Sequence, residues 1–385
     1  MSRHVIAPPA GTLALVTSEP TTLTVALDVG PLLGPLTGIG AAVGQIATAL
    51  RERGDIDLKP YACSFRGRLH PGMTRLPLPA ALAQRMWARL SYPRLDHWLR
   101  PAQVLHGANY TVAPSRLPRL VTVYDCWFLR NPQFARGDVS RAGRVLRRAV
   151  ASGAMVHASS HATADAVREL LGTDRVEVVS LAALPHVAPN GAEPAPIAEL
   201  IGVPFILALG TLERRKNLPR LVAAFADLAD RHPDLRLVLA GSDGDDCEAV
   251  NFAIDALQPS ARSRVILTGR MDDRVKAWLL SRAKVLAYPS LDEGFGFPLL
   301  EAMQHRVPVV ASTAGSIPEV AGDAAVLVPA DDVAALAAGL EHALTDTAER
   351  ARLIAAGIER VHFYSWSTTA EQLAALYHRL GEEGA

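Results

Sequence analysis

Short apolar runs alternate with helical patterns through the second half of this 385-residue chain. Each run is four to six residues long, consists mainly of aliphatic residues, and is followed by a segment in which apolar residues recur at helical spacing. The runs lie at 205–209, 235–240, 265–268, 285–288, 307–311 and 325–328. Fully buried strands joined by helices have this pattern, because helices cover both faces of a parallel sheet. The pattern predicts a doubly wound α/β domain.

The first half of the chain shows the same alternation less completely. Strands are predicted at 23–27, 120–124 and 154–158. Ile39, Val43 and Ile46 predict a helix directly after a glycine-rich loop. Because 49% of the residues are hydrophobic, the chain can bury two cores of ordinary size.

We therefore predict two domains and a final helix. The boundaries are an N-terminal domain at 1–190, a C-terminal domain at 191–365 and a closing segment at 366–385 that contains a helix over 370–380. The segment 188–196 is rich in proline and alanine and is predicted to be the linker.

Glu293 and Glu301 stand eight residues apart, across a glycine turn that follows the predicted strand 285–288. Two glycines between them permit positive φ, and Pro298 suits the first turn of a helix. A helix N-terminus offers unpaired N–H groups and a partial positive charge, which suit phosphate groups. The carboxylates can accept hydrogen bonds from sugar hydroxyls. An isolated acidic pair beside a helix is also compatible with a simple complement to the helix dipole.

A second strand-to-helix turn carries positive charge. Arg215 and Lys216 follow the predicted strand 205–209 within the segment Gly210-Thr-Leu-Glu-Arg-Arg-Lys-Asn217. In open α/β sheets ligands bind at the carboxyl ends of the strands, so these cations are placed to neutralise phosphates. A solvated charged turn is the alternative. The acidic turn that carries Glu293 follows another strand of the same domain in the equivalent position, which favours a binding site over a solvated turn.

These segments together resemble a known family. The chain is similar to family 4 retaining glycosyltransferases, which belong to glycosyl transferases group 1 and have the GT-B fold. The resemblance rests on the Glu-x7-Glu motif at 293–301, the basic segment at 210–217 and the glycine loop Thr37-Gly-Ile-Gly40. It implies two Rossmann-like domains facing a cleft, with a nucleotide sugar bound mainly by the C-terminal domain and an acceptor mainly by the N-terminal one. It also implies chemistry without a metal or other cofactor.

The resemblance assigns roles to individual residues. Arg215 and Lys216 would stabilise the leaving diphosphate. Glu293 would hold the sugar and Glu301 the ribose, and Asp125 is a further catalytic candidate. The donor-binding candidates are Gly38, Gly40, Tyr124, Thr211, Arg270, Gly294, Phe295, Gly296, Phe297, Leu300 and Glu301. By the same resemblance the leaving phosphate accepts the proton of the acceptor, so the two-carboxylate scheme of glycosidases does not apply.

Two positions depart from the family pattern. Many relatives have His-Asp where this chain has Tyr124-Asp125, and that His contacts the donor sugar. A phenol reaches further, so the donor preference or the activity is expected to change. The nearby His106 either compensates or has a structural role. Thr211 replaces a common Arg, so the positive charge must come from the three cations that follow it.

Relatives that share the Thr-Leu-Glu-x-Arg-Lys-Asn form include enzymes that use GDP-mannose or a deoxyhexose donor. The resemblance therefore favours a mannosyltransferase, with a dTDP- or UDP-sugar as the alternative donor. The implied acceptor is a saccharide or a polyprenyl-diphosphate-linked saccharide in polysaccharide, lipopolysaccharide or glycolipid synthesis. A sugar-nucleotide epimerase would need a general base that the motifs lack, and a non-catalytic nucleotide-sugar-binding assembly subunit remains a third hypothesis.

The net charge of zero hides an asymmetry. Residues 1–190 contain 21 Lys and Arg against 12 Asp and Glu, whereas residues 191–385 contain 18 against 27. Arginines and aromatic residues interleave over 85–100, which suits an anionic membrane or a phosphate-bearing acceptor. An ordinary solvated surface over core tryptophans is the alternative, since Pro93 interrupts a long helix. No nucleic-acid motif accompanies the arginines, so no nucleic-acid partner is expected.

The remaining sequence features indicate the cellular compartment in which the protein is found. Three cysteines are too few and too scattered for a disulfide framework or a thiolate zinc site. No run of about 18 apolar residues and no export signal is apparent. We expect a cytoplasmic protein, and the basic first half is compatible with contact at the inner face of the plasma membrane.

Overall fold

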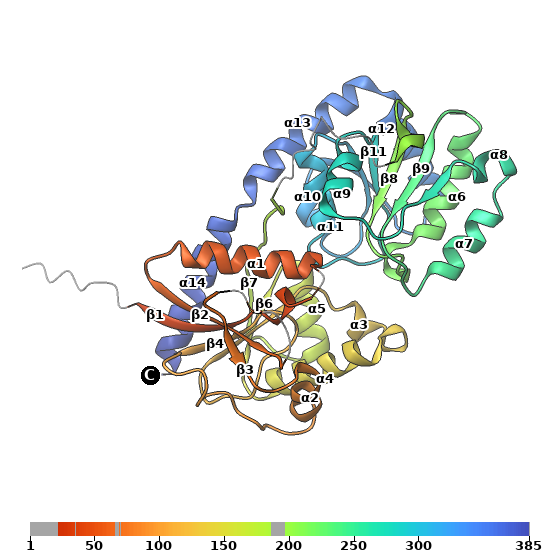
Figure 1. The fold of residues 1–385 in the computed structure, drawn as a ribbon. Helices are drawn as coiled ribbons and strands as arrows, with labels where there is room; N and C mark the ends of the chain where they lie inside the picture. The colour runs from red at the N-terminus through yellow and green to blue at the C-terminus, as the bar shows by residue number, and fades with distance from the viewer. Residues whose placement is uncertain (1–21, 35, 66–68, 70, 186–196, 385) are drawn as a thin grey trace, which may run out of the picture.

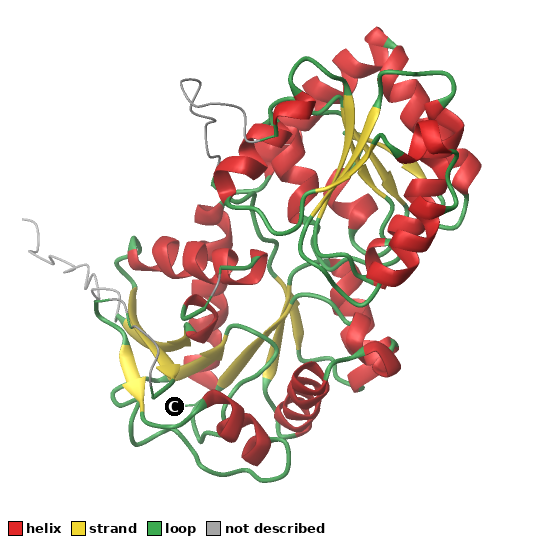
Figure 2. Cartoon of the chain, turned by 45° about the vertical axis from the view of Figure 1, so that its right-hand side comes forward, coloured by secondary structure: helices red, strands yellow, loops and turns green. Residues whose placement is uncertain are grey.

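The computed structural model describes residues 22–34, 36–65, 69, 71–185 and 197–384. The predicted linker at 188–196 lies outside these residues. Two parallel sheets, each packed between helices, form two α/β domains that lie end to end (Figures 1 and 2). This arrangement confirms the predicted fold class of two doubly wound parallel-sheet domains.

The N-terminal sheet has seven parallel strands in the order β3-β2-β1-β4-β5-β6-β7. Their bounds are β1 Leu23–Asp28, β2 Ile56–Cys63, β3 Thr74–Leu76, β4 Val104–Gly107, β5 Arg119–Val123, β6 Met155–Ala158 and β7 Val176–Val178. The strand order reverses between β1 and β4, which is the Rossmann arrangement.

The C-terminal sheet has six parallel strands in the order β10-β9-β8-β11-β12-β13. Their bounds are β8 Phe205–Leu209, β9 Arg236–Ala240, β10 Val265–Leu267, β11 Val285–Tyr288, β12 Val309–Ser312 and β13 Ala325–Val328. The reversal between β8 and β11 opens a crevice at their carboxyl ends, where α/β proteins bind ligands.

Helices connect the strands. In the N-terminal domain they are α1 Gly38–Arg51, α2 Ala80–Trp87, α3 Trp127–Arg130, α4 Gly137–Ala151 and α5 His161–Leu171, with short 3-10 turns at Gly30–Leu32 and Pro132–Phe134. The C-terminal half has α6 Leu218–Ala229, α7 Cys247–Asp255, α8 Pro259–Arg262, α9 Asp273–Leu280, α10 Phe297–Gln304, α11 Ile317–Ala321, α12 Val333–Thr345, α13 Thr347–Phe363 and α14 Trp366–Glu383, with 3-10 turns at Ala198–Leu200 and Arg214–Lys216. None of the helices in the described part of the chain is long and apolar enough to cross a membrane.

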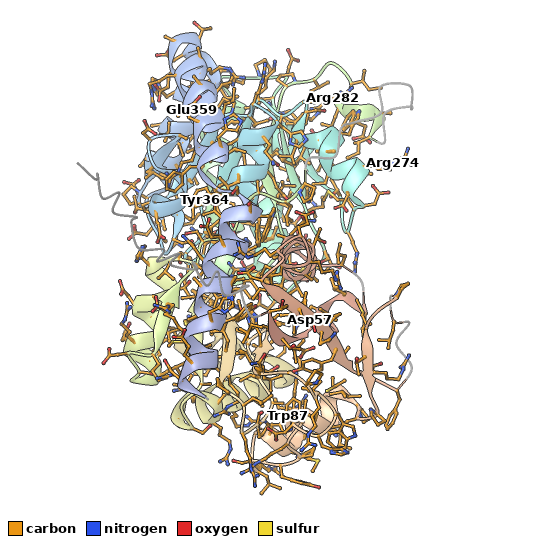
Figure 3. All side chains as sticks on the ribbon, turned by 90° about the vertical axis from the view of Figure 1, so that its left-hand side faces the viewer. Asp57, Trp87, Arg274, Arg282, Glu359 and Tyr364 are labelled. Carbon is orange, nitrogen blue, oxygen red and sulfur yellow. The ribbon has the colours of Figure 1, made fainter. Side chains whose placement is uncertain are left out.

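The last two helices join the domains. Helix α13 packs against α10 of the C-terminal domain, and α14 packs against α1, β1 and β4 of the N-terminal domain. Figure 3 shows the two helices running along both domains, with Glu359 on α13 and Tyr364 at the bend between them. Trp366 Nε1 donates to the Ala183 carbonyl at 2.9 Å, and this hydrogen bond fixes the start of α14 to the N-terminal domain.

A buried chain of hydrogen bonds anchors α14. His157 Nε2 lies 2.9 Å from the Val179 carbonyl, which can only accept, so Nε2 carries the proton of that ring. Thr122 then donates to His157 Nδ1 and accepts from His106 Nε2, at 2.9 and 2.7 Å. His106 Nδ1 is left to accept from the Tyr377 hydroxyl at 2.7 Å. Burial lowers the pKa of both histidines, His157 to about 4, so both rings are neutral at pH 7. His106 is therefore a structural residue and does not compensate for Tyr124.

We expect Tyr377→Phe to lower the melting temperature by about 2 °C. The change leaves His106 Nδ1 without its donor inside the core, and an unsatisfied buried acceptor costs about 1–3 kcal/mol. Differential scanning calorimetry measures the shift. Tyr92→Phe is the control, because Tyr92 is 66% exposed. Equal melting temperatures for both variants and the wild type would contradict the anchoring role.

Candidate active site

The switch point of the C-terminal sheet brings the two predicted charged turns together. Strand β8 leads into the 3-10 turn Arg214–Lys216, and its neighbour β11 leads into the loop that carries Glu293. The turns are tied by the backbone, since Leu291 N donates to the Arg215 carbonyl at 2.7 Å. Asn217 has a left-handed backbone conformation and donates through Nδ2 to the carbonyls of Pro289 and Ala330. This cross-link fixes the basic turn against the neighbouring loop.

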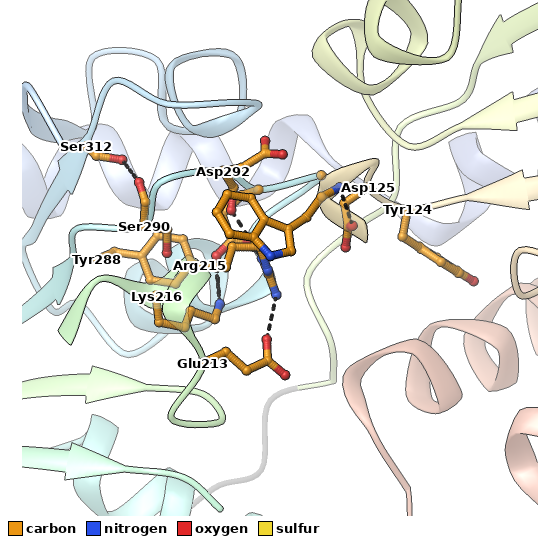
Figure 4. Close-up of polar contacts among 12 residues, drawn as sticks. Tyr124, Asp125, Glu213, Arg215, Lys216, Tyr288, Ser290, Asp292 and Ser312 are labelled. Carbon is orange, nitrogen blue, oxygen red and sulfur yellow. Dashed lines mark hydrogen bonds and ion pairs between the residues drawn. The ribbon is translucent and has the colours of Figure 1, made fainter. Parts of the chain in front are cut away.

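Both oxygens of the Glu293 carboxylate are held by cations, those of Arg215 and Lys216, which Figure 4 shows next to each other. Arg215 Nη1 donates to Oε2, and Lys216 Nζ donates to Oε1 at 2.7 Å and to the Tyr288 hydroxyl at 3.1 Å. Burial favours the neutral acid, but Arg215 and Lys216 outweigh it and lower the pKa of Glu293 to about 2. The carboxylate is thus ionised at neutral pH and orients both cations. Each cation keeps further N–H groups that can bind phosphate oxygens.

Helix α10 presents its N-terminus beside this cluster. Its N-cap is Gly296, whose φ of +87° favours glycine, and no side chain caps the helix. A Cβ at Gly294 would lie 1.5 Å from the Tyr124 carbonyl oxygen, so only glycine permits this approach of the two domains. Pro298 has no N–H and Leu299 N donates to the Gly296 carbonyl at 3.0 Å, which leaves the Phe297 amide at the start of the helix for an anion.

The N-terminus of α1, from the N-terminal domain, lies next to the N-terminus of α10, from the C-terminal domain. A Cβ at Gly38 would stand 3.7 Å from the Phe297 ring, which places the two helix starts side by side. Thr37 Oγ1 accepts from Gly40 N at 3.2 Å and caps the helix. Two helix N-termini from different domains therefore converge near the Glu293 cluster, as expected for a site that holds a diphosphate.

Glu301 lies on the second turn of α10. Its side chain is buried, and Oε1 accepts from Lys276 Nζ of α9 at 2.8 Å. Lys276 was absent from the sequence prediction, because nothing in its neighbourhood marks it apart from other helical lysines. The ion pair holds one carboxylate oxygen and leaves the other for a ligand.

A cavity of about 320 Å³ lies between the domains beside Glu293. It is lined by Asp125, Cys126, Trp127, Arg130, Asn131, Ala162, Thr163, Ala166, Leu291, Asp292, Glu293 and Gly315. Asp125 is fixed by two hydrogen bonds at 3.1 Å, from the Tyr110 hydroxyl and from Trp127 N. Burial and the nearby Asp125 raise the pKa of Asp292 to about 6. The cavity is thus bordered by three carboxyl groups, those of Asp125, Asp292 and Glu293, and Asp292 can carry a proton near neutral pH.

The raised pKa of Asp292 predicts a pH-dependent stability. The unfolded chain releases this proton near pH 4 and the folded protein near pH 6, so the side chain lowers stability progressively as pH rises between these values. We expect Asp292→Asn to have the melting temperature of the wild type at pH 4 and one about 3 °C higher at pH 7, because the pKa shift corresponds to at most about 3 kcal/mol of unfolding free energy. Calorimetry at both pH values measures the difference. If the melting temperatures of Asp292→Asn and the wild type differed by the same amount at pH 4 and pH 7, the raised pKa of Asp292 would be contradicted.

Several predicted donor-binding side chains do not face the cleft. The Tyr124 ring is buried and donates to the Ala108 carbonyl at 2.9 Å, and in Figure 4 it points away from Arg215. The expected contact between this phenol and the donor is therefore wrong, and only the Tyr124 backbone reaches the interface. Leu300 is fully buried, and Phe295 packs on Tyr364 with ring centroids 5.4 Å apart. These two residues can act only through the backbone or through packing.

The remaining candidates lie at strand ends. Thr211 is partly buried at the end of β8, with Oγ1 3.4 Å from Ser242 Oγ. Arg270 is exposed in the turn after β10, the edge strand, two strands away from the switch point. Among the described residues no group of three or more His, Cys, Asp and Glu side chains is placed to hold a metal ion. Chemistry without a metal stays a prediction.

Comparisons with known proteins identify the family. The family model for glycosyl transferases group 1 matches residues 196–360. Alpha-maltose-1-phosphate synthase of Mycolicibacterium smegmatis is 30% identical over 385 residues, covering 89% of this chain and 95% of the synthase. The chain belongs to the glycosyl transferases group 1 family. It is a glycosyltransferase, and the predicted enzyme class is confirmed.

Other relatives and solved structures agree with this assignment. The O-antigen chain mannosyltransferase B of Escherichia coli is 28% identical and covers 91% of this glycosyltransferase and 98% of its own chain. A phosphatidyl-myo-inositol mannosyltransferase of Mycolicibacterium smegmatis is 35% identical over 56% of this chain and 55% of its own. Sucrose-phosphate synthase from Thermosynechococcus elongatus superposes with a TM-score of 0.70 at 22% identity, covering 94% of this chain and 100% of its own. The fold is GT-B.

Proposed function

We propose that this glycosyltransferase is a family 4 retaining mannosyltransferase that transfers mannose from GDP-mannose to a saccharide or to a polyprenyl-diphosphate-linked saccharide. The observation that carries the proposal is the Arg215–Glu293–Lys216 cluster between two helix N-termini. The cluster has a net charge of +1, and the helix ends add partial positive charge. A diphosphate is the natural ligand for such a site.

The proposed reaction follows from the charge that develops. The bond between the sugar C1 and the phosphate oxygen breaks, and the acceptor oxygen forms a bond to C1 on the same face. The acceptor proton passes to the departing phosphate oxygen. Arg215, Lys216 and the Phe297 amide at the start of α10 stabilise the negative charge on the leaving diphosphate, and the cleft holds the acceptor hydroxyl in place. No nucleophilic side chain and no metal take part in this scheme.

The donor assignment rests on the named relatives and on Glu301. Mannosyltransferases are prominent among the similar proteins. Glu301 keeps one oxygen for the ribose hydroxyls while Lys276 holds the other. A dTDP- or UDP-sugar is the alternative donor. A non-catalytic assembly subunit is disfavoured, because such a subunit has no need for the buried ion cluster around Glu293.

The cavity beside Asp125 and Asp292 is our proposed acceptor site. It adjoins the Glu293 cluster and is lined by residues from both domains. The indole of Trp127 offers an apolar face to a sugar ring, and carboxyl and amide groups can bind its hydroxyls. A saccharide fits this lining better than an anion does.

We propose that the basic N-terminal half contacts the anionic cytoplasmic face of the plasma membrane. Arg85, Arg89, Arg94 and Arg100 are exposed, as is the Trp98 side chain. Guanidinium groups and aromatic rings together suit the headgroup region of an anionic bilayer. This location would bring the cleft to a lipid-linked acceptor.

Product analysis tests the reaction. We expect turnover of GDP-mannose with an oligosaccharide acceptor to continue in excess EDTA and to give an α-linked product, the configuration of the donor, when followed by NMR. A β-linked product would contradict the retaining mechanism, and loss of turnover on chelation would contradict the scheme without metal.

A further inference from the structure

A second cavity lies in the N-terminal domain, far from the cleft. It has a volume of about 190 Å³ and is lined by Trp87, Leu90, Ser91, Arg94, Val112, Pro114, Ser115, Arg119, Val145, Arg148, Ala149 and Ser152. Arg119 begins β5, whereas Asp125 of the cleft follows the other end of that strand. The five residues of β5 separate the two sites by about 15 Å. Figure 3 shows Trp87 at the end of the N-terminal domain that is remote from the C-terminal domain.

Three guanidinium groups line this cavity: Arg94, Arg119 and Arg148. In the part of the chain that the structure describes, no carboxylate forms an ion pair with any of them. The acid that acts on this group is Asp96, whose Oδ1 accepts from Ser115 Oγ at 2.7 Å and from Arg116 N at 2.6 Å. Asp96 offsets one of the three positive charges, so the group keeps a net charge of +2 that a phosphate can neutralise.

Arg119 is held in place within the cavity wall. Its Nη2 donates to the carbonyl of Ser152 at 2.6 Å and to Ser152 Oγ at 3.1 Å. Burial and the neighbouring Arg94 lower the pKa of Arg119. The other N–H groups of Arg119 make no further hydrogen bond to described residues, so they can bind a ligand. A fixed guanidinium with free donors is well suited to an oxyanion.

We propose that this cavity is a phosphate-binding site formed by Arg94, Arg119 and Arg148. A phosphate carries three acceptor oxygens and a charge that neutralises the cluster, and arginine forks match its geometry. The phosphate comes either from a soluble phosphorylated molecule or from a lipid headgroup. Leu90 and Tyr92 are exposed beside the cavity and would face the acyl region in the second case. This proposed phosphate site shares no lining residue with the cavity in the cleft, so it is independent of the sugar donor.

Binding of inorganic phosphate and of vesicles tests this site on the full-length protein. We expect saturable binding of phosphate, followed by Trp fluorescence, that is weakened about tenfold in Arg94→Gln and in Arg148→Gln. Both arginines are exposed, so these variants are expected to fold. Arg144→Gln is the matched control, since Arg144 is exposed on the same helix as Arg148 and does not line the cavity.

Phosphatidylglycerol vesicles identify the source of the phosphate. Vesicle binding that falls in Arg94→Gln and Arg148→Gln but not in Arg144→Gln indicates a lipid headgroup. Binding of phosphate alone, with no selective effect on vesicles, indicates a soluble ligand. Equal weakening in all three variants, or no saturable binding of either probe, would overturn the proposal. GDP binding serves as the internal reference, because the cleft is separate and stays unaffected in either case.

Discussion

Lys216→Gln is expected to lower kcat by roughly 100- to 1,000-fold, the usual effect of removing one charged donor from a site where negative charge develops. The ammonium of Lys216 is buried, with the residue only 8% exposed, and it lies 4.7 Å from the centroid of the Tyr288 ring, which the N-cap of α10 also approaches. Its charge acts on the departing diphosphate in a medium that screens it poorly. A steady-state assay with saturating GDP-mannose measures the loss.

Arg214→Gln is the matched control for this experiment. Arg214 precedes the two site cations, but its side chain is exposed and stacks 4.8 Å from the centroid of the Phe134 ring of the other domain. Removing an exposed cation–π contact costs at most about 1 kcal/mol of interaction free energy, so kcat/KM is expected to change less than about fivefold. Similar losses of activity in Lys216→Gln and Arg214→Gln would contradict a specific role for Lys216. Melting curves of both variants separate an effect on the site from unfolding.

The sequence predicted much of the C-terminal domain because its strands are buried on both faces. The runs at 205–209, 285–288 and 325–328 are strands with these same bounds. Strand β12 begins at Val309, two residues later than predicted, since Pro308 has no N–H for the sheet. The meeting of Arg215 with Glu293 also followed from sequence, because neighbouring parallel strands place their carboxyl-end loops together.

Other features depend on contacts between segments that are distant in sequence. Strands β2, β3, β4 and β7 were not predicted. β3 and β7 are short edge strands, β2 has several partly exposed residues, and β4 has only four residues, one of which is His106. The direction of the Tyr124 ring is set by the Ala108 carbonyl, sixteen residues earlier. Lys276 reaches Glu301 from another helix, and Tyr110 reaches Asp125 through an unusual positive φ of 55°. Such contacts leave no local periodicity that could be recognised.

Glu301→Gln is expected to weaken GDP binding by about 10- to 100-fold. The substitution keeps the shape of the side chain and removes the charge that accepts the ribose hydroxyls, and hydrogen bonds to a charged group are worth about 1.5–3 kcal/mol. Asp273→Asn is the matched control, because Asp273 is the other carboxylate near Lys276, at 3.7 Å, and is largely exposed. Its loss is expected to change GDP affinity less than about twofold.

Calorimetric titration of GDP, UDP and dTDP into the wild type, Glu301→Gln and Asp273→Asn, without added metal, tests the central claim most directly. We expect GDP to bind most tightly to the wild type, with at least about tenfold weaker binding to Glu301→Gln and nearly unchanged binding to Asp273→Asn. Tighter binding of UDP or dTDP would contradict the proposed donor. Equal GDP affinity in the wild type and Glu301→Gln would contradict the proposed nucleotide site.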